Sequence, residues 1–174
     1  TIEKAGDELP ENLDERARVI SMAALKFMLL KVNPKTTIMF DPQASIKFEG
    51  DTGPYVLYAY ARISSMLRKA ATDDVAPGAL DWSLLKEPAE RTLALRCALY
   101  PEMLQKAARD LDSSALAGYL LDLAKDFSGF YRNCPVLNAD VASLRTTRLA
   151  LSETVRAILA DGLQALTINT LESM

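Results

Sequence analysis

Apolar residues recur every three or four positions along most of this chain, which is the spacing of helices that bury one face. The predicted helices cover residues 12–31, 42–47, 54–71, 88–100, 101–111, 115–131 and 141–166. Prolines and short polar segments separate them, and residues 35–40 (KTTIMF) have the β-branched content of a short extended piece. Short loops between helices of this length predict an all-α antiparallel bundle.

Residues that commonly cap helices support several of these boundaries. Glu87-Pro88 opens one helix, and Asp112 with the two serines after it supplies caps for another. Asp140 is the expected cap of the last helix. Along that helix Arg145, Arg148 and Arg156 follow a strip beside the apolar one.

The helix predicted over residues 54–71 carries two different stripes. One stripe has the pattern of a core face and consists of Val56, Tyr60, Ile63 and Leu67. The other is amphipathic and cationic, and consists of Tyr55, Tyr58, Arg62, Met66 and Lys69. Two aromatic rings and a guanidinium beside the polar loop 48–53 form a platform suited to unpaired bases. The same stripe also fits a helix edge whose long side chains cover neighbouring apolar surface, so both interpretations stay open.

Composition and charge narrow the function classes. The 174 residues are 49% hydrophobic and 25% charged, typical of one ordinary globular domain, with no apolar run long enough for a membrane span. A net charge of −3 argues against a broad phosphate-binding surface and favours a few local contacts to exposed bases. The N-terminus is acidic and polar, unlike a secretory signal, and the missing initiator methionine fits a fragment of a longer polypeptide.

Candidate catalytic chemistry is scarce. The chain has no histidine, which excludes Ser-His and Cys-His arrangements and the commonest metal ligand. It has no glycine-rich phosphate loop, and Cys97 and Cys134 are too far apart for a CxxC site, so we expect them to be buried thiols. Charged neighbours such as Lys86/Glu87 and Glu90/Arg91 are expected on solvated helix faces. We therefore predict no catalytic residue and no metal site.

One segment carries a specific resemblance. Residues 48–62, FEGDTGPYVLYAYAR, resemble the start of the anticodon-binding domain of arginyl-tRNA synthetases, whose pattern is close to F-x-G-[ND]-T-x-P-Y-x-Q-Y-A-x-x-R. The matching positions are Phe48, Gly50, Asp51, Thr52, Pro54, Tyr55, Tyr58, Ala59 and Arg62. Further blocks are similar to family counterparts in the same order: ALKFMLLKVNPKTTIMFDP, DWSLLKEPAERTLAL, YLLDLAKDFSGFYRNCPVL and TTRLALSETVRAILADGLQAL.

The resemblance implies a fold and a role. The fold would be the helical anticodon-binding domain of class Ia synthetases over residues 48–174, with residues 1–47 as an appendage from the junction with the catalytic domain. The role would be contact with the anticodon loop of tRNA-Arg, chiefly its central cytidine. The residues implied are Gly50, Asp51, Thr52, Tyr55, Tyr58, Arg62 and Met174. Lys69 and Arg148 are candidates for contacts with the RNA backbone.

The resemblance also implies a parent enzyme, an arginine–tRNA ligase that uses ATP and Mg²⁺. We expect that enzyme to be cytoplasmic and monomeric, with its catalytic domain on the same polypeptide. The HIGH-like and KMSK-like motifs of that domain do not occur here, so the chain alone should be inactive.

Two departures from the family pattern bear on the site. Leu57 replaces the usual glutamine and, by its spacing, should point away from Tyr55 and Tyr58. The tail reads NTLESM where the family often has E-x-P-E-R-M, which removes a proline and an arginine that would stiffen it and contact phosphate. The alternative hypothesis is a freestanding helical module that binds proteins, with the tyrosine stripe as its hot spot. A HIGH-like motif upstream in the parent reading frame would discriminate the two.

Overall fold

The computed structural model describes residues 13–33, 35–37 and 41–173, and within them the regular structure is entirely helical. The elements are α1 (Leu13–Leu30), α2 (Pro42–Ser45), α3 (Gly53–Thr72), the 3₁₀ helix η2 (Trp82–Leu84), α4 (Pro88–Ala98), α5 (Tyr100–Asp110), α6 (Ser113–Asn133) and α7 (Ala142–Ala165). The expected all-α bundle is thereby confirmed.

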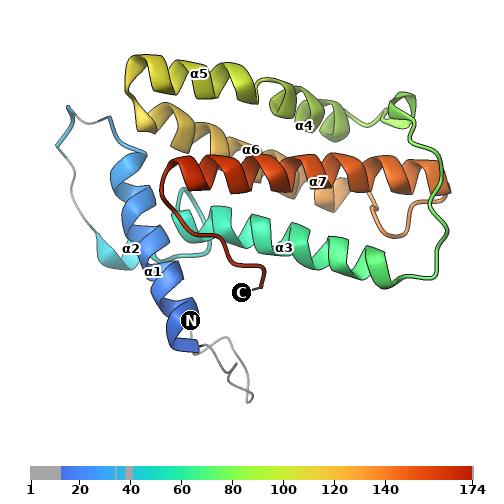
Figure 1. Cartoon of the computed structure of the whole chain (residues 1–174), viewed down its shortest axis with the longest axis horizontal. Coiled ribbons are helices and arrows are strands. Elements are labelled where there is room, and N and C mark those ends of the chain that lie inside the picture. Colours follow the sequence, from blue (N-terminus) through green and yellow to red (C-terminus); the bar gives the residue numbers. More distant parts are fainter. Residues whose placement is uncertain (1–12, 34, 38–40, 174) are drawn as a thin grey trace.

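Three long helices form the body of the bundle: α3 and α6 run in the same direction, and α7 runs antiparallel to both (Figure 1). The shorter helices α4 and α5 follow one another along the outer edge and pack on α6, while α1 crosses the bundle at one end (Figure 1). Helix α6 is central because it contacts α3, α4, α5 and α7. Its Leu120, Leu123, Phe127 and Phe130 have no exposed surface and form the middle of the apolar core.

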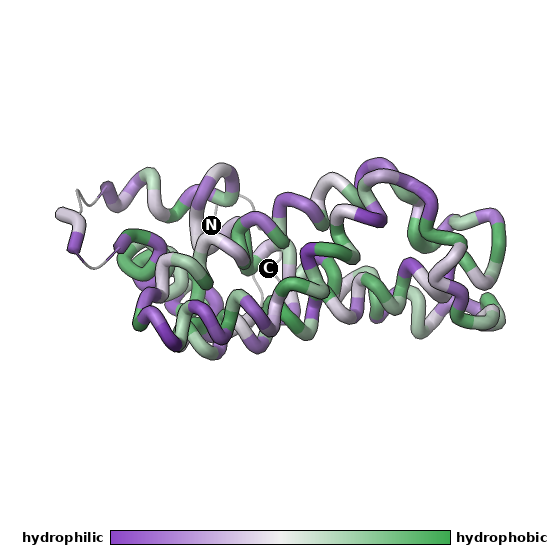
Figure 2. Tube along the Cα trace, turned by 90° about the horizontal axis from the view of Figure 1, so that it is seen from above, coloured by the Kyte–Doolittle hydropathy of each residue, from purple (hydrophilic) through white to green (hydrophobic). Residues whose placement is uncertain are grey.

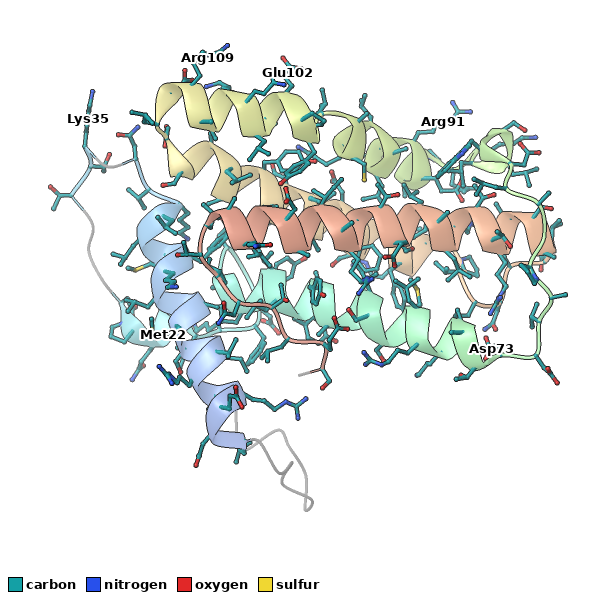
Figure 3. The ribbon with its side chains drawn as sticks, in the orientation of Figure 1. Met22, Lys35, Asp73, Arg91, Glu102 and Arg109 are labelled. Carbon is teal, nitrogen blue, oxygen red and sulfur yellow. The ribbon has the colours of Figure 1, made fainter. Side chains whose placement is uncertain are left out.

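The outer faces are polar, as the helical period of the sequence requires. Hydrophilic and hydrophobic residues alternate within single turns of the helices (Figure 2). Arg91, Glu102 and Arg109 point away from the bundle along the edge formed by α4 and α5 (Figure 3). Among the described helices, none combines the length and apolar content that crossing a bilayer demands.

Helix α1 belongs to the same core as the bundle. Phe27 is fully buried and Ala23 is 1% exposed, and both are members of the apolar cluster that contains Leu57. Gly53 allows this close approach, because a Cβ at that position would lie 2.8 Å from the Cβ of Phe27 and would collide with the carbonyl oxygen of Ala23. The boundary between an appendage over residues 1–47 and a domain over 48–174 stays a prediction.

Two local expectations are corrected. Asp140 does not cap the last helix: α7 begins at Ala142, its N-cap is Val141, and no side chain of the described residues caps it. Of the expected extended piece, residues 35 and 36 lie in a turn in which the Thr36 amide donates to the Asn33 carbonyl, and residues 38–40 lie outside the described residues.

The expected solvated position of Glu90 is also wrong. Its side chain has no exposed surface and lies 2.6 Å from the Nε atom of Arg148, which is itself buried. The two cysteines are buried as expected, and burial raises the pKa of the Cys97 thiol to about 11.

Candidate nucleic-acid interface

The loop over residues 48–53 has a defined shape. Gly50 has a φ of 77°, in the left-handed region that glycine adopts without strain. The Thr52 hydroxyl donates to the Lys47 carbonyl at 2.6 Å and accepts from the Tyr55 amide at 3.2 Å, so it closes the loop and caps α3. Pro54 then lies in the first turn of α3, where its fixed φ suits the helix.

Two lysines hold Asp51 in this loop. Lys31, directly after α1, donates to the Asp51 carbonyl oxygen at 2.6 Å. Lys125 of α6 donates to the carboxylate oxygen Oδ1 at 2.7 Å. The hydrogen bond from Lys125 lowers the pKa of Asp51, and the same contact raises the pKa of Lys125. The loop is thus tied to helices on both sides of it.

The tyrosine stripe of α3 is partly accessible and narrower than predicted. Tyr58 is 44% exposed, and Arg62 and Lys69 are exposed further along the same stripe. Tyr55 is half-buried and its hydroxyl donates to the Ser128 hydroxyl of α6 at 3.1 Å. Met66, predicted on this stripe, is 3% exposed and belongs to the core, which corrects that expectation.

Leu57 points away from the stripe as expected. It is fully buried in the core beneath it. The leucine at this position therefore contributes to the core and adds nothing to the accessible surface of the stripe.

Helix α6 supplies a residue that the sequence analysis missed. The guanidinium carbon of Arg62 lies 4.2 Å from the centroid of the Tyr131 ring and 5.9 Å from that of Tyr58. The cation therefore lies near two ring faces from two helices, within the range of cation–π attraction. Lys125, Ser128 and Tyr131 recur at intervals of three, so the sequence signals a shared face on α6. It carries no signal that this face lies beside α3.

The remaining predicted residues differ in outcome. Arg148 is 7% exposed and donates to the Pro135 carbonyl at 2.7 Å as well as pairing with Glu90, so the expectation that it contacts an RNA backbone is wrong. Met174 lies outside the described residues. The tail before it passes beside α3 (Figure 1), where the Tyr60 hydroxyl donates to Glu172 at 2.7 Å.

We name the accessible surface formed by Tyr58, Arg62, Lys69, Tyr131 and the Asp51 loop the reading face. It offers an exposed aromatic ring for stacking, a guanidinium with planar donors, and a carboxylate that accepts hydrogen bonds. Although the chain is acidic overall, with a net charge of −3, α3 presents cations here. Among the described residues, no group of three or more His, Cys, Asp or Glu side chains is placed to hold a metal ion.

Comparisons with known proteins show what the chain as a whole is similar to. The family model for the "DALR anticodon binding domain" matches residues 56–174. The arginine–tRNA ligase of Proteus mirabilis is 38% identical over 173 residues, which cover 99% of this chain and 30% of that protein. The arginine–tRNA ligase of Treponema denticola is 40% identical over 162 residues, which cover 91% of this chain and 28% of that protein. The chain thus spans about three tenths of the length of these relatives.

Solved structures show the same fold. The arginyl-tRNA synthetase of Thermus thermophilus superposes with a TM-score of 0.89 at 39% identity, covering 99% of this chain and 29% of that one. The arginyl-tRNA synthetase of Plasmodium falciparum superposes with a TM-score of 0.81 at 26% identity, covering 94% of this chain and 29% of that one. Because the family model matches well over half of the residues of this chain, the chain belongs to the DALR anticodon binding domain family.

Proposed function

We propose that this chain recognises the anticodon loop of arginine tRNA as the C-terminal part of an arginine–tRNA ligase. The observation that carries the proposal is the reading face: Arg62 lies near the rings of Tyr58 and Tyr131, on the helix that follows the loop with Asp51. Its occurrence in a chain of the DALR family, alongside relatives named as arginine–tRNA ligases, supports RNA as the partner.

Each group of the reading face has a proposed task. The exposed ring of Tyr58 stacks on an unpaired base, and Arg62 hydrogen-bonds a base or a phosphate. Carboxylates accept hydrogen bonds from the N4 amine of cytidine, and Asp51 is the carboxylate of the loop. Its orientation by Lys125 suits it to favour the central cytidine. Gly50 and Thr52 shape the loop that carries it.

Lys69 is proposed to contact the RNA backbone. It is exposed on α3, two turns beyond Arg62 on the same stripe. A single ammonium of this kind attracts phosphate without reading sequence, so it adds affinity more than discrimination.

The rest of the parent protein is proposed to activate arginine with ATP and Mg²⁺ and to join it to the tRNA, in the cytoplasm. Helix α1 offers that part a docking surface, because Met22, Leu25 and Leu29 are 44%, 38% and 46% exposed on a helix whose other side packs on α3. The HIGH-like and KMSK-like motifs expected for that part do not occur in this sequence, so we expect the chain alone not to activate arginine.

The test is binding of the chain to an arginine-tRNA anticodon stem-loop and to the same stem-loop with its central cytidine replaced. We expect the replacement to weaken binding by about tenfold, since a lost base-specific contact is worth roughly 1–3 kcal/mol. Equal affinity for both RNAs, or no binding to either, would contradict the proposal. The second result would favour a module that binds proteins.

A further inference from the structure

We propose that Glu172 is a positioning residue, which attaches the C-terminal tail to α3 and α7 and so fixes the tail along one border of the reading face. We name its contacts with Tyr60, Arg68 and Arg156 the clasp. The inference rests on the proposed function, because the border matters only if RNA occupies that face.

Three side chains from two helices converge on Glu172. The Tyr60 hydroxyl of α3 donates to its Oε1 at 2.7 Å. Arg68, two turns further along α3, contacts the other carboxylate oxygen at 3.4 Å and the Glu172 backbone carbonyl at 3.1 Å. Arg156 of α7 lies 3.7 Å from Oε1. Both oxygens of the side chain and the backbone of this one residue are therefore held.

Tyr60 gives the clasp a fixed point. The residue is 5% exposed and its ring belongs to the apolar core, so the hydroxyl cannot move far. The side chain of Glu172 is by contrast 59% exposed, and contacts of such an exposed group add little to global stability. The geometry therefore suits a residue that determines where the tail lies more than whether the bundle folds.

The turn at the end of α7 and a contact with α1 fix the tail on either side of the clasp. Thr167 has a φ of 58°, and the Ile168 amide donates to the Leu163 carbonyl at 2.8 Å, the backbone pattern that turns a chain sharply out of a helix. Ile168 is then buried at 3% exposure. Beyond the clasp, Arg16 of α1 donates to the Ser173 carbonyl at 2.7 Å. The tail is thus held before, at and after Glu172.

The position of the clasp on α3 places the tail next to the reading face. Successive residues of a helix are about 100° apart, so the order around α3 is Arg68, Tyr58, Arg62 and Tyr55. The first of these contacts the tail and the last contacts Ser128 of α6. The accessible residues Tyr58 and Arg62 accordingly lie in a strip with the tail on one side and α6 on the other.

The experiment compares Tyr60→Phe with Tyr119→Phe. Tyr60→Phe removes the clasping hydroxyl and leaves the core ring and the tail sequence unchanged. Tyr119→Phe is the matched control, because Tyr119 is also 5% exposed and its hydroxyl donates to a carbonyl, that of Arg96, remote from the tail. Two quantities are measured: the rate at which a carboxypeptidase releases the last residues of the native chain, and the dissociation constant for the cytidine stem-loop.

We expect Tyr60→Phe, and not Tyr119→Phe, to speed the release several-fold and to weaken stem-loop binding. Glu172→Ala should weaken binding as much or more, Glu172→Gln should retain part of it, and Tyr60→Phe should add nothing further to Glu172→Ala. Equal release rates from the two tyrosine variants would contradict the proposal that Tyr60 and Glu172 hold the tail. Faster release with unaltered stem-loop affinity would overturn its positioning role. Failure of the unmodified chain to prefer cytidine would instead refute the proposed function, while the release rates still report on the clasp.

Discussion

The carboxylate of Glu90 joins the start of α4 to the second turn of α7 through Arg148. One oxygen accepts from the backbone amide of Glu87 at 2.9 Å and completes the cap of α4, while the other lies 2.6 Å from Nε of Arg148. The guanidinium reaches on to the Pro135 carbonyl, in the connection between α6 and α7. A buried pair thus fixes three segments of the bundle in relation to one another.

Removing one partner of this pair should be costly. We expect Arg148→Met to destabilise the fold by about 3–5 kcal/mol, because it leaves the charge of Glu90 buried without compensation. Denaturant unfolding measures the loss, and Glu90→Leu combined with Arg148→Met should recover much of it. If Arg148→Met keeps its stability and loses affinity for RNA, the assignment of Arg148 as a structural residue is wrong.

Tyr58→Ala should weaken binding of the stem-loop by about tenfold, because a stacked base is worth roughly 1–3 kcal/mol. The melting temperature should change little, since the ring is 44% exposed. Trp82→Ala is the matched control: that ring is 50% exposed in a short helix that packs on α7. A stability loss without any change in base discrimination would show that Tyr58 is a core residue.

Arg62 and Tyr131 should contribute jointly to RNA binding. We expect the effects of Arg62→Met and Tyr131→Leu to be non-additive by about 0.5–1 kcal/mol, the usual value of an exposed cation–π contact. A double-mutant cycle on the stem-loop dissociation constant measures this coupling. Strictly additive effects would mean that the two side chains act independently, despite the 4.2 Å between the guanidinium carbon and the ring centroid.

Glu172 should show a pH signature. The hydrogen bond from Tyr60 is the main cause that lowers the pKa of this carboxyl below its ordinary value of 4.5. Because the folded-state pKa is depressed, the contribution of the clasp is complete above pH 4.5 and is lost as the pH falls through the lower native value. Carbon NMR titration of the Glu172 carboxyl should give a midpoint below 4.5 that rises in Tyr60→Phe. An unchanged midpoint would show that the hydroxyl does not control this group.

Gly53→Ala should destabilise the chain by about 1–3 kcal/mol, because the added methyl would overlap Ala23 and Phe27 of α1. Gly118→Ala in the interior of α6 is the contrasting variant, since no atom lies within 4 Å of its added methyl. That change should be neutral or stabilise by about 0.5–1 kcal/mol through helix propensity. Thermal unfolding of both variants checks the pair, and equal effects would contradict the close packing of α1 on α3.

The sequence was most informative where local spacing decides the structure. The period of α3 predicted the accessible stripe with Tyr58 and Arg62, because neighbours three and four apart share a face. Met66 was misplaced, since spacing alone does not show how far α6 covers the edge of that stripe. Glu90, Arg148 and Tyr131 depend on partners in other helices, and a single sequence carries no signal for which helices pack together.

The burial of Phe27 has a consequence for chimaeric proteins, in which domains of this family from different parents are exchanged. An exchange point at residue 48, the first residue of the motif 48–62, would pair a foreign α1 with the native α3. Residue 27 of the incoming sequence would then have to fit a space shaped around a fully buried phenylalanine, with Gly53 directly beneath it. Exchanges should therefore carry α1 together with the bundle and place the junction before Leu13.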